Sequence, residues 1–188
     1  MNALLVADVD TIGSYDAISW GLLVLRVVTG LTLAAHGWNK FFGGGRIAGT
    51  AAWFDSMGMR PNGRIHALLA ASTELGGGLM FAAGLLTPLS AAAVVGLMVV
   101  AAWTVNRPNG FFTMNHGWEF NLILATIAVG IATTSPGNLS LDWVLGIEPA
   151  FDPNVGLSVS LGLGVAAGAA LIAACYRPPT PDDDGTDD

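Results

Sequence analysis

The chain has 188 residues, of which 53% are hydrophobic and only 11% are charged. Soluble domains are about one quarter charged, so this composition excludes an ordinary soluble enzyme and indicates a membrane protein. The one cysteine, Cys175, excludes an intramolecular disulfide, a dithiol redox pair and a cysteine zinc site. The sequence has no basic stripe of the kind that binds nucleic acid, so no nucleic-acid partner is expected.

Acidic residues mark both ends of the chain. Residues 1–16 contain three aspartates and no Lys or Arg, so we expect an acidic N-terminal tail there. A cleaved signal peptide is not expected, because it needs a basic start. Five of the fourteen acidic residues fall in residues 182–188, after a proline-rich stretch. We therefore expect residues 176–188 to form a solvated, disordered acidic tail.

Five apolar segments lie between these tails. They cover residues 17–35, 65–86, 89–105, 118–134 and 155–175. A membrane-spanning helix needs about 17–25 residues, so each segment is long enough, with the fourth at the lower limit. The sequence therefore predicts an all-α fold, a polytopic membrane helical bundle whose first partner is the lipid bilayer.

Basic residues outside the apolar segments occupy one set of loops. Four lie between the first two segments, one lies between the third and fourth, and one follows the fifth: Lys40, Arg46, Arg60, Arg64, Arg107 and Arg177. The other loops contain no Lys or Arg. Because cytoplasmic loops carry the excess of these residues, we expect a multi-pass protein of the cell membrane. Its N-terminus is expected outside and its C-terminus in the cytoplasm.

Two charges lie deep within the apolar segments, Arg26 in the first and Glu74 in the second, whereas Glu119 stands at the start of the fourth. At a rise of about 1.5 Å per residue from the predicted inner ends, both lie about 15 Å deep. Each charge alone would cost roughly 2.5–3.5 kcal/mol at the centre of a bilayer. We therefore predict that Arg26 and Glu74 form a buried ion pair, which either holds the helices together or also handles protons or a ligand.

Polar and aromatic side chains gather at the predicted inner boundary. They are His36, Trp38 and Lys40 after the first segment, and His116, Trp118 and Glu119 at the start of the fourth. Trp at a boundary is ordinarily an anchor, but the whole group could bind the polar head of an amphipathic small molecule. A third histidine, His66, is expected at the interface without a role. Both boundary histidines lie on one side, so haem ligation is not favoured and no metal site is predicted.

The fifth segment contains Gly164-x-x-x-Gly168, a spacing that allows close helix contact. Two interpretations stay open. The glycines pack within the chain's own bundle, or they form a contact with another subunit.

Several short motifs occur in a fixed order. They are HGWNKFFGG at 36–44, FDSMGM at 54–59, ELGGGL at 74–79, GLLT at 84–87, NGFF at 109–112, GWEF at 117–120 and SLD at 140–142. Together they resemble the DoxX family across residues 20–146. The resemblance implies a four-helix membrane domain, here residues 17–146, to which residues 155–175 add a fifth transmembrane helix. This chain has Asn106 where the family often has His, which weakens a haem or proton relay there.

The resemblance also implies a function, because the family is named for the quinone-reducing subunit of a thiosulfate:quinone oxidoreductase. The expected role is an integral membrane subunit of a quinone-linked redox system, with electrons supplied by a protein partner. In this interpretation His36 or His116 hydrogen-bonds a quinone oxygen beside Trp38 or Trp118, with Lys40 at the same mouth. Glu119 then exchanges protons with water.

Two alternatives stay open beside the redox role. One is a non-catalytic scaffold or assembly factor for a partner complex, which docks through Gly164 and Gly168. The other is a small-molecule carrier, although the sequence shows no inverted repeat and five spans do not divide evenly.

Overall fold

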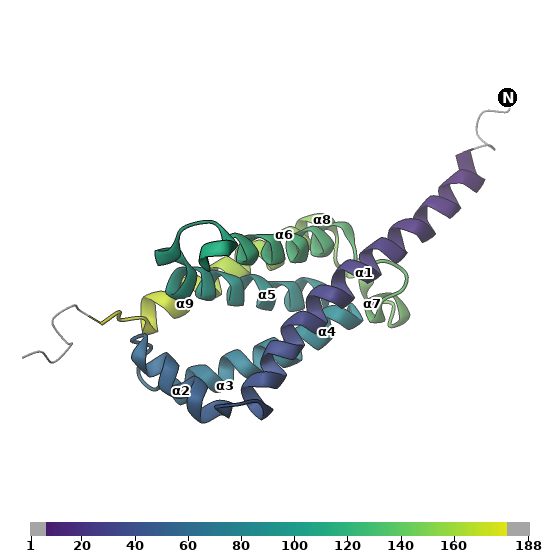
Figure 1. Ribbon diagram of the computed structural model, residues 1–188. Helices are drawn as coiled ribbons and strands as arrows, with labels where there is room; N and C mark the ends of the chain where they lie inside the picture. Colours follow the sequence, from purple (N-terminus) through teal and green to yellow (C-terminus); the bar gives the residue numbers. More distant parts are fainter. Residues whose placement is uncertain (1–6, 180–188) are drawn as a thin grey trace, which may run out of the picture.

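The computed structural model describes residues 7–179, with side chains from Asp16 onward except at position 149. Within these residues the chain forms long helices joined by short turns (Figure 1). The first half comprises α1 (Ala7–Phe42), α2 (Arg46–Ser56), α3 (Gly63–Ser72), the π-helical η1 (Thr73–Gly77), α4 (Gly78–Ala83) and α5 (Thr87–Ala101). The second half comprises π-helical η2 (Ala102–Asn106), the 3₁₀ turns η3 (Arg107–Asn109) and η4 (Thr113–Asn115), α6 (Glu119–Thr134), α7 (Leu141–Val144), the 3₁₀ turn η5 (Glu148–Ala150), α8 (Pro153–Leu157), π-helical η6 (Ser158–Leu163) and α9 (Gly164–Cys175).

Four continuous helices in the described residues are long and apolar enough to cross a membrane. They are Asp16–Phe42, Gly63–Ala83, Thr87–Asn109 and Pro153–Cys175. The predicted all-α polytopic bundle is confirmed. The remaining predicted span corresponds to α6, which has 16 residues and is therefore about 24 Å long, shorter than the hydrocarbon core.

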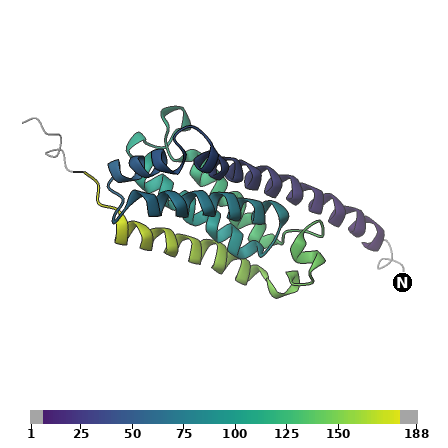
Figure 2. The same cartoon turned by 90° about the horizontal axis from the view of Figure 1, so that it is seen from below.

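Helix α5 occupies the centre of the bundle, and its two neighbours along the second half of the chain are α6 and α9. Helix α1 packs instead against α3, η1 and α4. Phe81, Val94, Val95 and Ile131 are almost fully buried between these elements and form the main core. Figure 2 shows α9, in yellow, running along the length of the bundle.

The glycines of α9 explain how this helix approaches α5 so closely. A Cβ atom on Gly164 would lie 2.7 Å from the Cβ atom of Val95, and one on Gly168 would lie 3.0 Å from the carbonyl oxygen of Gly96. Both glycines are buried in this contact. Of the two interpretations of Gly164 and Gly168, the structure has the packing within the chain's own bundle, because α5 covers that face.

Both predicted tails contain ordered structure. Helix α1 begins at Ala7, so it includes the second half of the predicted N-terminal tail. At the other end, the backbone N–H of Arg60 donates to the oxygen of Cys175 (2.8 Å) and that of Arg177 donates to the oxygen of Gly58 (2.9 Å). The chain after α9 is thus tied to the turn between α2 and α3. The acidic residues 182–188 lie outside the described residues.

The structure brings the loops that carry the six basic residues to one end of the bundle, which we call the basic end. The start of α3, the end of α5 and the end of α9 all lie there (Figure 1). The predicted orientation requires these loops to lie on one side of the membrane, and the structure has them at one end of the bundle. Which side of the membrane this end faces stays a prediction.

We expect a membrane-impermeant thiol reagent to distinguish the two ends in intact cells. In a Cys175→Ala background, Asn154→Cys should be labelled from outside and Gly44→Cys should not. Both positions are exposed, and nothing lies within 4 Å of a Cβ atom added at Gly44. Permeabilised cells should label both variants, which controls for reactivity. Labelling of Gly44→Cys alone in intact cells would reverse the orientation.

Candidate functional site

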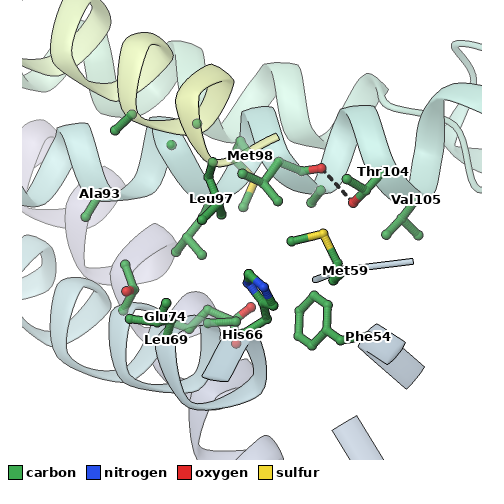
Figure 3. A pocket seen from close by; sticks show the side chains of 18 of the residues that line it. Phe54, Met59, His66, Leu69, Glu74, Ala93, Leu97, Met98, Thr104 and Val105 are labelled. Carbon is green, nitrogen blue, oxygen red and sulfur yellow. Dashed lines mark hydrogen bonds between the residues drawn. The ribbon is translucent and has the colours of Figure 1, made fainter. Parts of the chain in front are cut away.

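A cavity of about 590 Å³ lies between α3 and η1 on one side and α5, η2 and α9 on the other. Most of its lining is aliphatic or aromatic, and Figure 3 shows Leu97 and Met98 projecting into it from α5. Its polar lining residues are Lys40, His66, Thr73, Glu74, Thr104 and Asn106. An apolar cavity of this size with a few convergent polar groups is the usual form of a small-molecule site.

The cavity is closed toward the basic end by α2 and the turn that follows it. Phe54 and Met59 form this floor and are 8% and 1% exposed. Met59 also pairs with Tyr176 in an isolated antiparallel bridge, and Leu171 of α9 packs against the same group. The fifth transmembrane helix therefore completes a wall and part of the floor of the cavity.

The three π-helical segments each supply lining residues. Thr73 and Glu74 come from η1, Thr104 and Asn106 from η2, and Leu163 from η6. A π segment accommodates an extra residue in a helix and is frequently found at functional sites. The coincidence of all three at one cavity supports a functional role for it.

Glu74 is held by Lys40 and not by Arg26. The Nζ atom of Lys40 lies 2.5 Å from Oε1 of Glu74 and also contacts Oε2. The prediction of an Arg26–Glu74 pair is therefore wrong. It took His36 as the inner end of the first span, whereas α1 continues to Phe42 and brings Lys40 alongside η1. Gly37 fixes this register, because a Cβ atom there would lie 2.5 Å from the backbone nitrogen of Leu75.

Arg26 lies at the opposite end of the same helix pair. Its side chain is 1% exposed, and Nη2 donates to the backbone oxygen of Leu139. The guanidinium also abuts Gly84, which has a φ of +64° and has no room for a Cβ atom. Asp142 is the carboxylate that attracts Arg26 electrostatically. Nη2 is thus the guanidinium nitrogen with a hydrogen-bond partner among the described residues, whereas Nε and Nη1 have none there. This site lies far along α1 from Glu74.

Asp142 itself is fully buried and caps the start of α5. Its carboxylate accepts from the backbone N–H groups of Leu86 (2.6 Å) and Thr87 (2.8 Å) and from the hydroxyl of Thr87 (2.6 Å). Its own N–H donates to the oxygen of Gly84 (2.8 Å). The SLD and GLLT motifs are therefore joined at this end of the bundle, where they fix the turn between α4 and α5.

The residues predicted to form a mouth are mostly outside the cavity. Of the six, only Lys40 lines it. His36 and Trp38 are exposed on α1, and His116 is exposed in the loop before α6. These side chains face the surroundings of the protein rather than an enclosed site.

Two other predicted residues stabilise the loop that precedes α6. Oε2 of Glu119 accepts from the backbone N–H of Thr113 (3.0 Å), and Trp118 packs edge-on against Phe111 at 4.8 Å between ring centroids. Asn106, at the position where the resemblance suggests His, donates from Nδ2 to the oxygen of His116 (2.7 Å). These contacts give the loop an ordered shape beside the cavity.

His66 is the residue that sequence reasoning missed. It is 4% exposed rather than at the interface, and it lines the cavity beside Phe54 (Figure 3). Its Nε2 atom lies 2.7 Å from the oxygen of Arg60, and Nδ1 has no partner among the described residues. A carbonyl oxygen only accepts, so Nε2 carries a proton and donates to it. The helical spacing from His66 to Thr73 and Glu74 was the signal that could have placed them on one face.

Within the part of the chain that the structure describes, no group of three or more His, Cys, Asp and Glu side chains could hold a metal ion.

Known proteins match the part of the chain that builds most of the cavity. A family model described as DoxX matches residues 21–107. A curated protein of Bacillus subtilis (strain 168), named "Putative oxidoreductase CatD", is 33% identical over 122 residues, which cover 65% of this chain and 84% of that protein. No solved structure matches the chain. All the lining residues that precede α8 lie within 21–107, so the part of the cavity outside the family match comes from η6 and α9.

Proposed function

The chain belongs to the DoxX family, and from this membership we propose that it is the integral membrane subunit of a quinone-linked redox system. The observation that carries the proposal is the cavity between α3, α5 and α9. The name of the Bacillus subtilis relative supports the redox part. The quinone site is assigned to the cavity, and no longer to a mouth formed by His36, His116 and Glu119.

The shape and chemistry of the cavity suit a quinone. Quinones are apolar molecules that dissolve in the bilayer, and the cavity offers them aliphatic walls from α5 and α9. Leu69 and Leu163 line its edge and are each about half exposed, at 53% and 50%. The cavity is therefore open sideways between α3 and α9, where a ligand can enter from the hydrocarbon region without crossing water.

The polar groups of the cavity can hydrogen-bond to the two carbonyl oxygens of a quinone and exchange protons with them. Lys40 offers ammonium donors to a carbonyl oxygen, and Glu74 is a carboxylate that can accept or return a proton. Reduction of a quinone requires two electrons and two protons, so a proton-exchanging group beside the ring is useful. The electrons come from a partner subunit in this proposal, because the chain has one cysteine and no thiol pair.

Binding of a short-chain quinone analogue should stabilise the protein, measured as a thermal shift in detergent. At about 100 times its dissociation constant the ligand should add about 2.7 kcal/mol to the free energy of unfolding. Ala93→Phe, which places a ring into the cavity, should abolish this gain. His36→Ala and His116→Ala are the controls and should respond like the wild type, because neither residue lines the cavity.

The same experiment distinguishes the two candidate positions of the quinone site, which are the cavity and the surface mouth. A full shift in Ala93→Phe would contradict binding in the cavity. If the shift survives in Ala93→Phe and disappears in the two histidine variants, the surface mouth is the site after all. No shift in any protein would contradict quinone binding and favour the scaffold.

One observation supports the scaffold as a second candidate. The loop before α6 exposes large apolar side chains at the basic end, with Met114 85% and Phe112 59% exposed. Exposed apolar groups of this kind often form protein contacts. Co-purification in mild detergent tests this alternative, which requires a partner complex whose recovery depends on Met114 and Phe112 but is unchanged by Ala93→Phe.

A further inference from the structure

A second cavity lies on the outside of the bundle, between the end of α5 with η2 and η3 and the end of α9. It has a volume of about 580 Å³. Its lining consists of two arginines, two large aromatic residues and small or apolar residues: Trp103, Arg107, Pro108, Ile172, Ala173, Tyr176, Arg177 and Pro178. Among the described residues that line this cavity none is acidic, and none of them also lines the larger cavity.

Both arginines are held in place without a carboxylate. The guanidinium of Arg107 lies over the ring of Trp103, 4.1 Å from its centroid. Nη1 of Arg177 donates to the backbone oxygens of Ala173 (3.0 Å) and Tyr176 (2.7 Å). Neither arginine forms an ion pair with another described residue. Two oriented guanidinium groups therefore face one hollow with hydrogen-bond donors left over, which is an arrangement that favours a phosphate.

The position of the cavity relative to the membrane determines which phosphate-containing molecules can reach it. Thr87–Asn109 and Pro153–Cys175 are two of the apolar membrane-spanning helices, and Arg107 and Arg177 lie at or just beyond their ends. Trp103 and Tyr176 lie beside them, as expected for aromatic side chains at the level of the lipid headgroups. Ile172 and Ala173 continue the cavity down the apolar surface of α9. A molecule with a phosphate group at one end and a hydrocarbon chain at the other matches this arrangement, with the phosphate at the arginines and the chain along the apolar surface of α9.

We propose that this cavity binds the headgroup of an anionic phospholipid, with the phosphodiester between Arg107 and Arg177 and an acyl chain along Ile172. The site is independent of quinone binding. A lipid held there joins the end of α5 to the end of α9. Because α9 is also a wall of the larger cavity, occupancy by the lipid stabilises the helix that the family match does not include.

The test uses the full-length protein, purified in detergent and freed of lipid. Phosphatidylglycerol, phosphatidylcholine with the same acyl chains, and inorganic phosphate are titrated separately, with the unfolding temperature as the readout. Phosphatidylglycerol should stabilise the wild type at lower concentrations than phosphatidylcholine. In this site each arginine donates a charge-assisted hydrogen bond to the phosphodiester, worth about tenfold in affinity, so Arg107→Gln with Arg177→Gln should weaken binding about 100-fold.

The matched control is Arg46→Gln with Arg64→Gln, which removes the same charge from two exposed positions at the same end. This variant should keep the affinity of the wild type. Equal weakening in both double variants would overturn the site, because the effect would then be attraction to the whole basic end. Equal responses to the two lipids would also overturn it, as would a full response to inorganic phosphate alone, which would assign the cavity to free phosphate. The shift is compared within each variant, so a less stable variant is still informative.

Discussion

Asp142→Ala is expected to destabilise the protein by about 3–5 kcal/mol, the cost of breaking a buried charge interaction. The substitution leaves the backbone N–H groups of Leu86 and Thr87 and the hydroxyl of Thr87 without their acceptor. It also removes the carboxylate that offsets the buried charge of Arg26. Asp142 is fully buried, so these groups have no contact with bulk water in the wild type.

The free energy of unfolding is measured in mixed micelles, with the circular dichroism signal of the helices as the probe. The control is Asp152→Ala, which removes an aspartate that caps α8 through the backbone N–H groups of Asn154 (2.7 Å) and Val155 (3.1 Å). Asp152 is exposed, so its loss should cost only about 0.5–2 kcal/mol, as for other helix N-caps. Equal losses in the two variants would show that Asp142 acts as an ordinary cap and that Arg26 is stabilised in another way.

The sequence was sufficient to predict the membrane helices, because the bilayer imposes a simple physical condition on them. Backbone N–H and C=O groups in hydrocarbon must bond within their own segment, so each long apolar run must be helical. The segments at 65–86 and 155–175 correspond closely to Gly63–Ala83 and Pro153–Cys175. The first segment was predicted too short, because residues 36–42 are polar and aromatic and yet continue α1 past its apolar part.

The site could not be predicted because it depends on the register between helices that are distant in the sequence. Arg26 and Glu74 were assigned similar depths from an assumed helix end. The true register is set by the close approach of Gly30 to Gly78 and of Gly37 to Leu75, which places Lys40 beside Glu74. Composition and spacing do not specify this offset.

The burial of His66 could not be predicted from the local sequence, because it depends on a contact between two helices. Its burial results from α2 folding back so that Phe54 packs near the imidazole, with ring centroids 6.1 Å apart. The turn after α2 is then fixed by the chain beyond α9, through the bridge between Met59 and Tyr176. More than one hundred residues separate these partners in the sequence. The cavity floor is therefore a property of the assembled bundle.

Glu74→Leu is expected to destabilise the protein by about 3 kcal/mol, because it leaves the ammonium group of Lys40 without its partner inside the bundle. This value is at the lower end for broken buried pairs, since the side chains of Lys40 and Glu74 are still 20% and 13% exposed. Replacing both residues, as Lys40→Met with Glu74→Leu, should recover most of the loss. Unfolding in mixed micelles of the two single variants and the double variant gives the coupling energy.

The same series distinguishes the observed pairing from the one predicted from depth alone. Arg26→Leu should destabilise strongly by itself, because it empties a fully buried position next to Gly84. Its effect should add to that of Glu74→Leu within about 0.5 kcal/mol, as for sites that share no partner. A coupling of 1 kcal/mol or more between Arg26 and Glu74, with none between Lys40 and Glu74, would mean that α1 is displaced along α3 and α4. Lys40 would then not line the cavity, and the proposed quinone site would lack this hydrogen-bond donor.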